Sequence, residues 1–433
     1  MIKKLIIAAL LTEIFSPILI WKAGLPSAFR WISAGSVFLV IVIGLIQMLR
    51  RNKVPWVLIL VLALILIGVV QAFTNGGSPT SILWGIWQMF KYPLLGIIVS
   101  QQEDFSSELT KKVYLWGFLL LMVQIIVQLL QYIFGETDPD QLAGTFSQYR
   151  WGGTTPLVLV LIFISCLFLC RWIVSNKSMS VIIVFLLASF SSVLGELKIF
   201  FPVYFSIVII SLIFLIIYKK WRKIFSLLIL VGLFFCTLQL LQNKPINTNL
   251  TFDVNNAFDY SRYLDPEVFY KYFNTTQQWS SDAGFTPGRN YYITQVVRII
   301  SHDPVTLWFG MGIGAQSESK TLGTVGSAIQ QGDLGNVSGT SLTVLLGEYG
   351  ILGIISFALS VILILINLAA LSRSSNSPNH LGLINALFVF SLFWPIWVWY
   401  SSSWILGAPM IIYWTLLGYI FQQQNKKSLE YKI

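Results

Sequence analysis

The feature that most constrains this chain is a series of apolar runs, each about as long as a bilayer is thick. Segments such as 54–73 and 341–371 consist mostly of Leu, Ile, Val, Ala and Phe. A stretch of roughly 18 or more apolar residues is typical of a membrane-spanning helix, because a helix satisfies its own backbone hydrogen bonds in lipid. The 433 residues are only 11% charged, whereas soluble domains carry roughly 25%. We therefore predict an all-α, polytopic membrane protein.

The apolar runs, taken in order, predict about twelve transmembrane helices. The run 180–218 is too long for one crossing, so it is divided at GELK (195–198). Segment 341–371 is also long, and we expect it to begin as an interfacial piece or to be strongly tilted. The expected spans are 4–21, 31–49, 54–73, 80–100, 113–134, 153–170, 179–194, 199–218, 224–241, 341–371, 381–400 and 404–422.

The distribution of basic residues predicts the orientation of these spans. Lys and Arg collect in alternate short loops and at both ends, as at Lys3, Lys4, Lys426 and Lys427. Because short cytoplasmic loops are enriched in Lys and Arg, both termini are expected in the cytoplasm. The same rule accounts for the formal charge of +10, so nucleic acid is not expected as a partner. Glu13 within the first apolar run argues against a cleaved signal peptide.

One long segment without a spanning run divides the chain into three parts. Spans 1 to 9 occupy residues 1–241, and spans 10 to 12 with a cytoplasmic tail occupy residues 341–433. Between spans 9 and 10, residues 242–340 form a loop that the predicted topology places outside, in the periplasm or at the cell exterior. Any chemistry in this loop would therefore act at the outer face of the membrane.

The loop contains a predicted amphipathic helix near residues 289–302. Its apolar residues recur at i, i+3, i+4 and i+7, at Ile293, Val296, Val297 and Ile300. Arg298 and His302 are four residues apart on the opposite side, and Asp303-Pro304 is expected to end the helix. One interpretation has the apolar face on the membrane domain and Arg298 facing an aqueous cavity. The alternative is an interfacial helix whose arginine anchors to lipid head groups.

The charges of the loop favour individually placed arginines. Residues 242–340 hold six Lys and Arg against eight Asp and Glu, which argues against a general patch for anionic lipid. Single guanidinium groups can each bind a phosphate through two hydrogen bonds. The glycine-rich GMGIG (310–314) is interpreted either as an anion-binding nest of backbone N–H groups or as a mobile lid.

Further charges are predicted at the outer ends of other spans. Arg150 precedes the sixth span, and Glu196 and Lys198 interrupt the run 180–218. Ionisable groups at such breaks are costly and often functional, although contact with interfacial water is the simpler interpretation. Cys166 and Cys170 are four apart without a nearby His or carboxylate, so no metal site is expected.

These motifs resemble those of the O-antigen polymerase/ligase superfamily of bacterial membrane glycosyltransferases. The resemblance is carried by GR…R…HDP…GMGIG (288–314) and by SLTVLLGEYGILGIISF (341–357). The segments GTFSQYRWGG (144–153) and LGELKIFF (194–201) are also similar to segments that precede the long loop of that family. The matching residues are Arg289, Arg298, Pro304, Gly312, Gly314, Glu348, Gly350 and Gly353.

The resemblance implies a GT-C-like fold in a bacterial inner (plasma) membrane and a lipid-linked glycan substrate. Such enzymes join glycans carried on a polyprenyl (undecaprenyl) diphosphate, as in lipopolysaccharide, exopolysaccharide or capsule biosynthesis. Arg289, Arg298, Arg150 and Lys198 would hold the diphosphate, with the two loop arginines catalytic. Glu196 would be a base or an orienting group. The other candidates are His302, Glu348, Gly312 and Gly314. The bilayer, a flippase and a chain-length regulator would be partners, and no cofactor or metal is implied.

One departure from the family pattern favours a polymerase over a ligase. Ligases of this family usually carry a His-Asn pair about nine residues before the glutamate of the leucine-rich helix. Counting back from Glu348 reaches Gly339-Thr340 instead. Transfer of the glycan to another acceptor by a ligase nevertheless remains an alternative. A transporter of lipid-linked glycans is a second alternative, although the chain shows no clear internal repeat of the kind that transporters contain.

Overall fold

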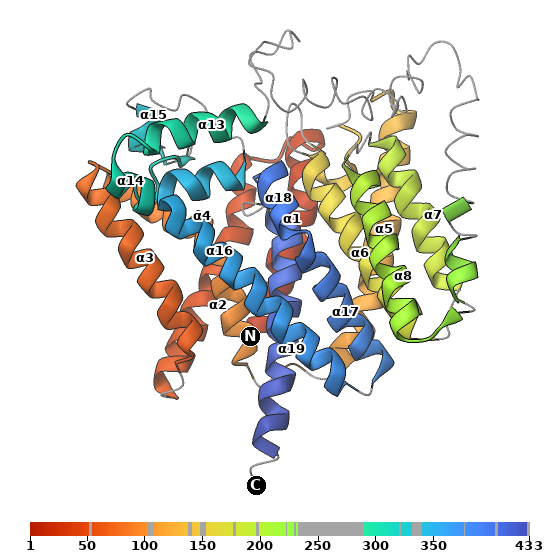
Figure 1. Cartoon of the computed structure of the whole chain (residues 1–433). Helices are drawn as coiled ribbons and strands as arrows, with labels where there is room; N and C mark the ends of the chain where they lie inside the picture. Colours follow the sequence, from red (N-terminus) through yellow and green to blue (C-terminus); the bar gives the residue numbers. More distant parts are fainter. Residues whose placement is uncertain are drawn as a thin grey trace.

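The protein is a bundle of helices (Figure 1). Its strands, within the described part of the chain, are β1 (Glu318–Ser319) and β2 (Thr324–Val325), which pair antiparallel with Glu318 opposite Val325. The predicted all-α fold is thus confirmed. The structure is a computed structural model that describes residues 1–51, 54–102, 105, 108–136, 141–147, 153–175, 179–195, 199–221, 223–228, 231–232, 289–319, 322–330, 340–375, 377–402 and 406–430.

Seven of the described helices are long and apolar enough to cross a membrane. They are α1 (Ile2–Lys22), α2 (Trp31–Arg50, preceded by η1, Ser27–Arg30), α3 (Trp56–Thr74), α4 (Pro79–Ser100), α5 (Glu108–Ile133), α6 (Thr154–Val174) and α16 (Ser341–Ser374). An eighth span results if α17 (Pro378–Leu392) and α18 (Trp394–Tyr400), which meet at a bend of 45°, are one broken span.

The prediction of twelve spans is met only in part by these seven or eight. Two shorter apolar helices, α7 (Met179–Leu194) and α8 (Phe200–Ile217), coincide with the expected spans on either side of GELK. The helix α19 (Gly407–Glu430) covers residues 407–422 of the span expected at 404–422, and its C-terminal part is polar. The span expected at 224–241 lies largely outside the described residues.

A short polar turn, residues 75–78, separates α3 from α4. The turn between α3 and α4 shows how the local sequence begins a helix there. The Ser78 hydroxyl accepts a hydrogen bond from the Ser81 backbone N–H at 3.2 Å, and Pro79 occupies the first helical position. A serine cap satisfies an N–H group that the helix leaves free, and proline has no N–H to satisfy. The sequence NGGSP therefore ends one helix and starts the next.

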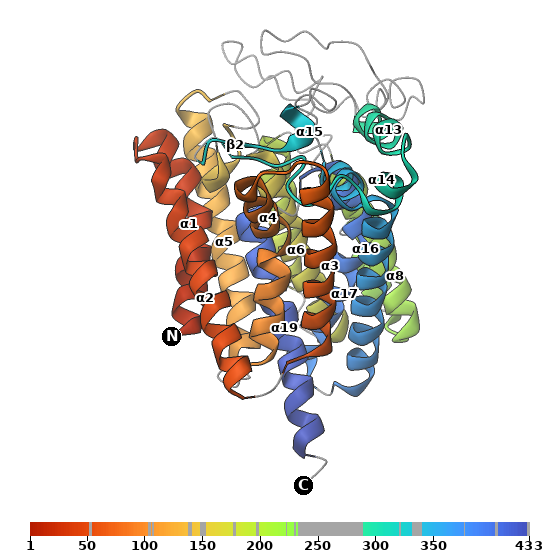
Figure 2. The same cartoon turned by 90° about the vertical axis from the view of Figure 1, so that its left-hand side faces the viewer.

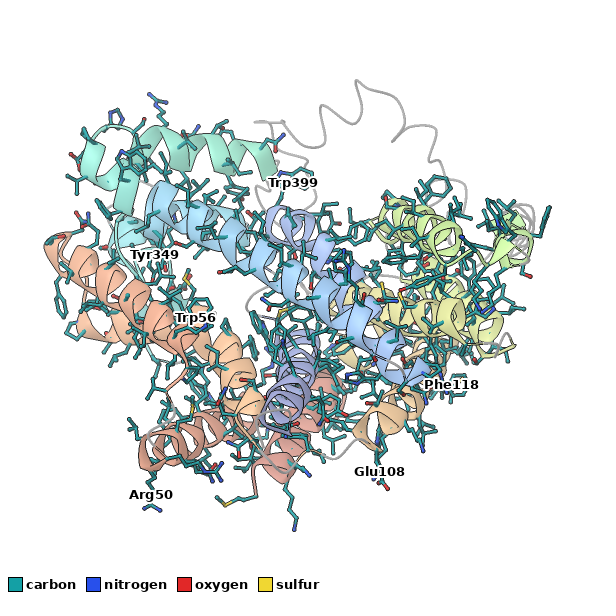
Figure 3. The ribbon with its side chains drawn as sticks, turned by 60° about the horizontal axis from the view of Figure 1, so that its bottom comes forward. Arg50, Trp56, Glu108, Phe118, Tyr349 and Trp399 are labelled. Carbon is teal, nitrogen blue, oxygen red and sulfur yellow. The ribbon has the colours of Figure 1, made fainter. Side chains whose placement is uncertain are left out.

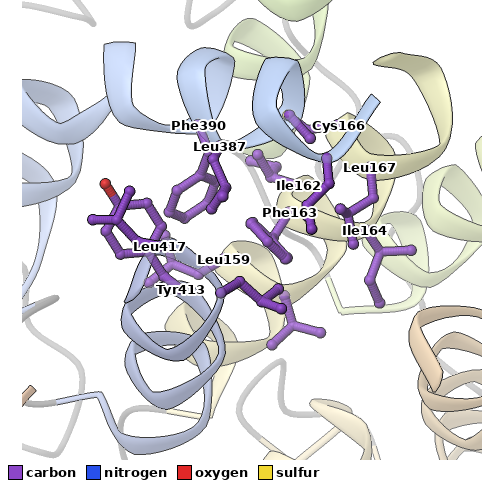
Figure 4. Close-up of a cluster of buried hydrophobic side chains, with 14 of the residues drawn as sticks. Leu159, Ile162, Phe163, Ile164, Cys166, Leu167, Leu387, Phe390, Tyr413 and Leu417 are labelled. Carbon is purple, nitrogen blue, oxygen red and sulfur yellow. The ribbon is translucent and has the colours of Figure 1, made fainter. Parts of the chain in front are cut away.

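Helix α6 lies at the centre of the bundle, where nearly all of its residues are buried. It packs against α17, α7, α8 and α19, and Figure 4 shows the apolar side chains that meet there. Phe163 of α6 and Phe390 of α17 form an edge-to-face pair with ring centroids 5.2 Å apart. Cys166 and Cys170 are buried free thiols. Cys236 lies outside the described residues.

The two ends of the bundle differ. Figures 1 and 2 show both chain termini toward one end and α13 (Arg289–Ile300), α14 (Pro304–Phe309) and α15 (Ser327–Gln330) at the other. We call the described residues 289–319 and 322–330 the cap, and the two ends the cap end and the termini end. In the cap, α13 packs on α16, and α14 packs on α16 and α3.

Helix α16 is divided by a kink at Gly350, which has φ 59° and ψ −148°. The part before the kink lies across the cap end, and the part after it runs toward the termini end (Figure 1). A φ of this sign is easy only for glycine. The kink agrees with the prediction that the long segment 341–371 begins as a separate piece. It also leaves residues 351–374, roughly 36 Å of helix at 1.5 Å per residue, to span the membrane.

The amphipathic helix predicted at 289–302 is present but ends earlier than expected. It ends at Ile300, and Asp303-Pro304 begins α14 instead of ending α13. The Asp303 carboxylate accepts the Thr306 backbone N–H at 2.8 Å and so caps the second helix. The predicted apolar face is also narrower than expected. Val296 and Ile300 are buried in the cap, whereas Val297 is 42% exposed, because only one side of α13 meets α16.

Candidate functional site

The glycine-rich loop of the cap, residues 310–317, is inserted between α3 and α16. Its residues up to Gln316 are buried. The Met311 N–H donates to the Gly347 carbonyl at 2.7 Å, and the Gly312 N–H donates to the Glu348 carbonyl at 3.1 Å. On the other side, the Ile313 N–H donates to the Gly68 carbonyl of α3 at 3.0 Å. The loop therefore hydrogen-bonds to both helices.

Gly312 is required by both its conformation and its surroundings. Its φ is +95°, a region that side chains rarely adopt. A Cβ atom on Gly312 would lie 2.1 Å from the backbone nitrogen of Ala72. Because that neighbour is backbone within a helix, it cannot move aside as a flexible side chain could. The second glycine predicted for the site, Gly314, meets α4 in a similar way, at the Ser81 carbonyl.

Glu348 lies beneath this loop and is 1% exposed. Its Oε1 accepts hydrogen bonds from the Gln316 backbone N–H and the Ser317 hydroxyl, both at 3.2 Å. The loop's N–H groups thus bind the protein's own carboxylate and carbonyls. The interpretation of GMGIG as a nest of free N–H groups is not supported, because the N–H groups of residues 311–313 donate within the protein. The interpretation as a mobile lid stays a prediction. Glu348 acts as the anchor that fixes the loop to α16.

Two buried polar side chains beside Glu348 are not satisfied by described parts of the chain. Both the Nε2 and Oε1 of Gln316, and the hydroxyl of Tyr349, have no hydrogen-bond partner there. Figure 3 shows Tyr349 between α16 and α3, where it also meets Phe90 of α4 edge to face. Buried polar groups without partners are rare and costly.

Helix α13 lies over this region and presents a cation to solvent. Arg298 is exposed, and its guanidinium group makes no ion pair or hydrogen bond with the described part of the chain. His302, just beyond the helix, is also exposed. The start of α13 is fixed by Trp399 of α18, whose indole N–H donates to the Asn290 side-chain oxygen at 3.1 Å (Figure 3). A helix anchored at its start therefore presents an exposed arginine at the cap end.

The remaining predicted site residues are described only in part. Arg289 begins α13, but its side chain lies outside the described residues. Arg150, Glu196 and Lys198 lie outside them altogether, so their predicted roles stay predictions. Of the predicted residues, those that come together are Gly312, Gly314 and Glu348. Arg298 and His302 belong to the neighbouring helix and its end. The described residues contain no cluster of three or more His, Cys, Asp or Glu side chains suited to a metal ion.

A second buried loop, residues 141–147, was not predicted from the sequence. Gln128 Nε2 donates to the Leu142 carbonyl at 2.8 Å and to the Ser191 carbonyl of α7 at 3.1 Å. The Ser191 hydroxyl donates back to Gln128 Oε1. Irregular backbone at membrane depth requires such partners within the protein. Three buried glutamines of α5, at i, i+4 and i+7, supply them: Gln124, Gln128 and Gln131.

The glutamine spacing was the available signal for this loop, since polar side chains on one face of an apolar helix are seldom exposed to lipid. The residues of this loop and of α7 that are hydrogen-bonded to these glutamines lie shortly before predicted site residues in the sequence. Ser147 comes three residues before Arg150, and Ser191 comes five residues before Glu196. The glutamines therefore fix the chain immediately before each of these two charged segments.

The helices and their apolar surfaces define the class of protein: the chain is a multi-pass helical membrane protein. Comparison with models of known protein families gives no match, and no curated protein is significantly similar to the chain. The particular function must therefore be argued from the site and from the motifs of the sequence.

Proposed function

We propose that this protein polymerises polyprenyl-diphosphate-linked oligosaccharide units into a surface polysaccharide. The observation that carries the proposal is Arg298, whose exposed guanidinium group makes no ion pair with the described residues and lies on a helix that packs across one end of a membrane bundle. A lipid-linked diphosphate requires a cation near the membrane surface. The likeness of residues 144–357 to the O-antigen polymerase/ligase superfamily supports the same function.

The proposal includes a topology in the bacterial plasma membrane. Twelve spans with both termini in the cytoplasm would leave residues 242–340, and with them the cap, on the outer side. The position of the cap at the end opposite the termini supports this arrangement (Figure 2). Glycan that has crossed the membrane on its lipid carrier would then meet the enzyme at the outer face. A flippase and a chain-length regulator are the partners that such a reaction calls for.

The proposed chemistry is a glycosyl transfer. A hydroxyl oxygen of the acceptor glycan attacks the anomeric carbon of the donor, and the bond from that carbon to the diphosphate oxygen breaks. The diphosphate leaves with the bonding electron pair, and the hydroxyl proton passes to a base. Guanidinium groups placed where negative charge develops lower the barrier to this step. We assign that role to Arg298 and Arg289, with Arg150 and Lys198 as further diphosphate ligands, and the base to Glu196.

The structure suggests how Arg298 could be kept in place during such a reaction. Val296 and Ile300, on the inner side of α13, pack with Met311 and Ala315 of the glycine-rich loop. That loop is in turn anchored by Glu348. We therefore give Glu348 a positioning role, in which it supports the helix that carries the cation. His302 is a neighbour of the arginine with no assigned step.

The proposal is tested with purified protein and a polyprenyl-diphosphate oligosaccharide as the sole substrate. Products are resolved by length, and a ladder of repeat units is expected. Arg298→Ala should reduce the rate about a hundredfold or more. Arg298→Lys keeps the charge but loses the two-pronged hydrogen bonding and should be intermediate. Two variants serve as controls and should retain activity: Thr294→Ala, one turn earlier on the exposed side of α13, and Arg373→Ala at the termini end.

Other outcomes would identify the alternatives. Transfer that occurs only when a different acceptor is added would mean a ligase. No transfer with native substrate, together with movement of the lipid-linked glycan across a vesicle membrane, would mean a transporter. A full ladder from folded Arg298→Ala would leave polymerisation in place but remove this arginine from its centre.

A further inference from the structure

Helix α14 exposes an apolar face at the cap end of the bundle. Val305 is 53% exposed, Trp308 51% and Phe309 41%. Their spacing of i, i+3 and i+4 places them on one side of the helix. The opposite side is covered, since Leu307 packs with the buried apolar residues of the cap. Three neighbouring large apolar side chains form an exposed apolar patch, and such patches commonly mark a surface that contacts lipid or another protein.

The level of α14 along the bundle is set by its contact with α16. A Cβ atom on Gly350 would lie 2.5 Å from the Leu307 carbonyl oxygen and 2.8 Å from the Trp308 carbonyl carbon. The backbone of α14 therefore touches α16 at its kink. The part of α16 long enough to span a membrane begins at that kink. The helix α14 thus lies at the boundary of the apolar zone rather than above it.

The exposed face of α14 continues the apolar surfaces of its neighbours. It packs on α3 and α16, and both of these helices expose large apolar side chains. On α3, near its cap end, Val70 is 54% and Phe73 58% exposed, and on α16, after the kink, Ile355 is 44% exposed. In a multi-pass membrane protein these side chains face lipid. The exposed face of α14 lies at the edge of this lipid-facing surface, so lipid is expected to contact it as well.

We propose that α14 is an interfacial helix whose Val305, Trp308 and Phe309 insert into the bilayer leaflet at the cap end. The partner is bilayer lipid at the boundary between acyl chains and head groups, where tryptophan is enriched because its ring is apolar and its N–H is polar. Arg298 and His302, within about ten residues of Trp308 along the chain, would then lie near the level of the lipid phosphates. The anchor is independent of the proposed glycosyl transfer.

The proposal is tested on the full chain, reconstituted in phosphatidylcholine–phosphatidylglycerol vesicles. Nitroxide labels are placed at single cysteines, Val305→Cys and Phe309→Cys, after Cys166, Cys170 and Cys236 are replaced by Ala. Collision with oxygen reports lipid exposure, and collision with a nickel chelate reports water exposure. Leu66→Cys, on the exposed face of mid-α3, is the lipid-facing control. Thr294→Cys, on the exposed side of α13, is the water-facing control.

The labels at 305 and 309 are expected to collide with oxygen nearly as often as the label at 66, and several-fold less often with nickel than the label at 294. Nickel collisions equal to those at 294 would overturn the proposal. So would protection from both reagents, because another part of the protein would then cover α14. Trp308 gives a check without cysteines. Brominated lipid should quench wild-type fluorescence more than that of Trp308→Phe, and equal quenching would contradict the anchor.

Discussion

Replacing Gly312 by alanine measures how tightly the glycine-rich loop is packed between α3 and α16. Two costs are expected. The left-handed conformation at φ +95° costs a residue with a Cβ about 1–2 kcal/mol. The new Cβ would also lie 2.1 Å from the Ala72 nitrogen and 2.2 Å from its Cα. Relief of such overpacking costs about 1–3 kcal/mol more. The sum, about 2–5 kcal/mol, is a large part of the stability of a typical domain.

A matched control separates these two costs. Gly76 also has a positive φ, +73°, but a Cβ there would meet nothing within 4 Å. Gly76→Ala should therefore lower the free energy of unfolding only by the cost of the left-handed conformation, about 1–2 kcal/mol. The assay is thermal unfolding in detergent with a thiol-reactive dye, because Cys166 and Cys170 are buried and free and react when the bundle opens. Cys236 is replaced by Ala in both variants and in their parent.

The unfolding midpoint of Gly312→Ala is expected to fall clearly further than that of Gly76→Ala. At roughly 2 °C per kcal/mol for a long chain, the falls are about 4–10 °C and about 2–4 °C. Equal midpoints for the two variants would refute the reasoning. They would mean that the Cβ at 312 meets no obstacle, and hence that the loop does not lie against α3 as described.

Three further predictions concern single polar groups. Glu348→Ala should lower the free energy of unfolding by about 2–6 kcal/mol, since it leaves two donors unsatisfied at about 1–3 kcal/mol each. Glu348→Gln should lower it less. Thermal unfolding compares the two variants, and equal losses would contradict the anchor. Gln128→Leu should lower the free energy of unfolding by about 1–3 kcal/mol. Thermal unfolding measures this loss, with lipid-facing Leu66→Ala as a near-neutral control. The Thr306 hydrogen bonds lower the pKa of Asp303, so this carboxylate stabilises α14 above the pKa of the unfolded chain. That stability is lost as pH falls through the lowered pKa. Hydrogen exchange of α14 should rise in Asp303→Ala at neutral pH, and unchanged exchange would argue against the cap.

The sequence was most informative about the long helices. Runs such as that of α3 can be read directly, because apolar composition and length suffice to identify a span. The need to divide the run 180–218, and the expectation that segment 341–371 begins as a separate piece or is tilted, followed from length. The position of the kink at Gly350 was not predicted. The count of twelve was not reached among the described helices, in part because α7 and α8 are short and α18 is bent away from α17.

The candidate site was less predictable, because it depends on contacts between distant segments. The residues of GMGIG and Glu348 were identified as candidates by motif. The Gly312 N–H donates to the Glu348 carbonyl, and contacts between residues so distant along the chain have no signal in local periodicity. The exposure of Val297 was missed for a related reason. Helical spacing shows which residues share a face, but not how wide the surface is that covers it.

The most direct test of the central claim is the stoichiometry of the reaction. Purified protein is incubated with polyprenyl-diphosphate oligosaccharide alone, and the released polyprenyl diphosphate is counted against the new glycosidic bonds. Polymerisation through a diphosphate leaving group predicts one released carrier for each bond, with both lost together in Arg298→Ala. Release of the carrier without chain growth, or no release from folded wild-type protein supplied with its native substrate, would contradict the account.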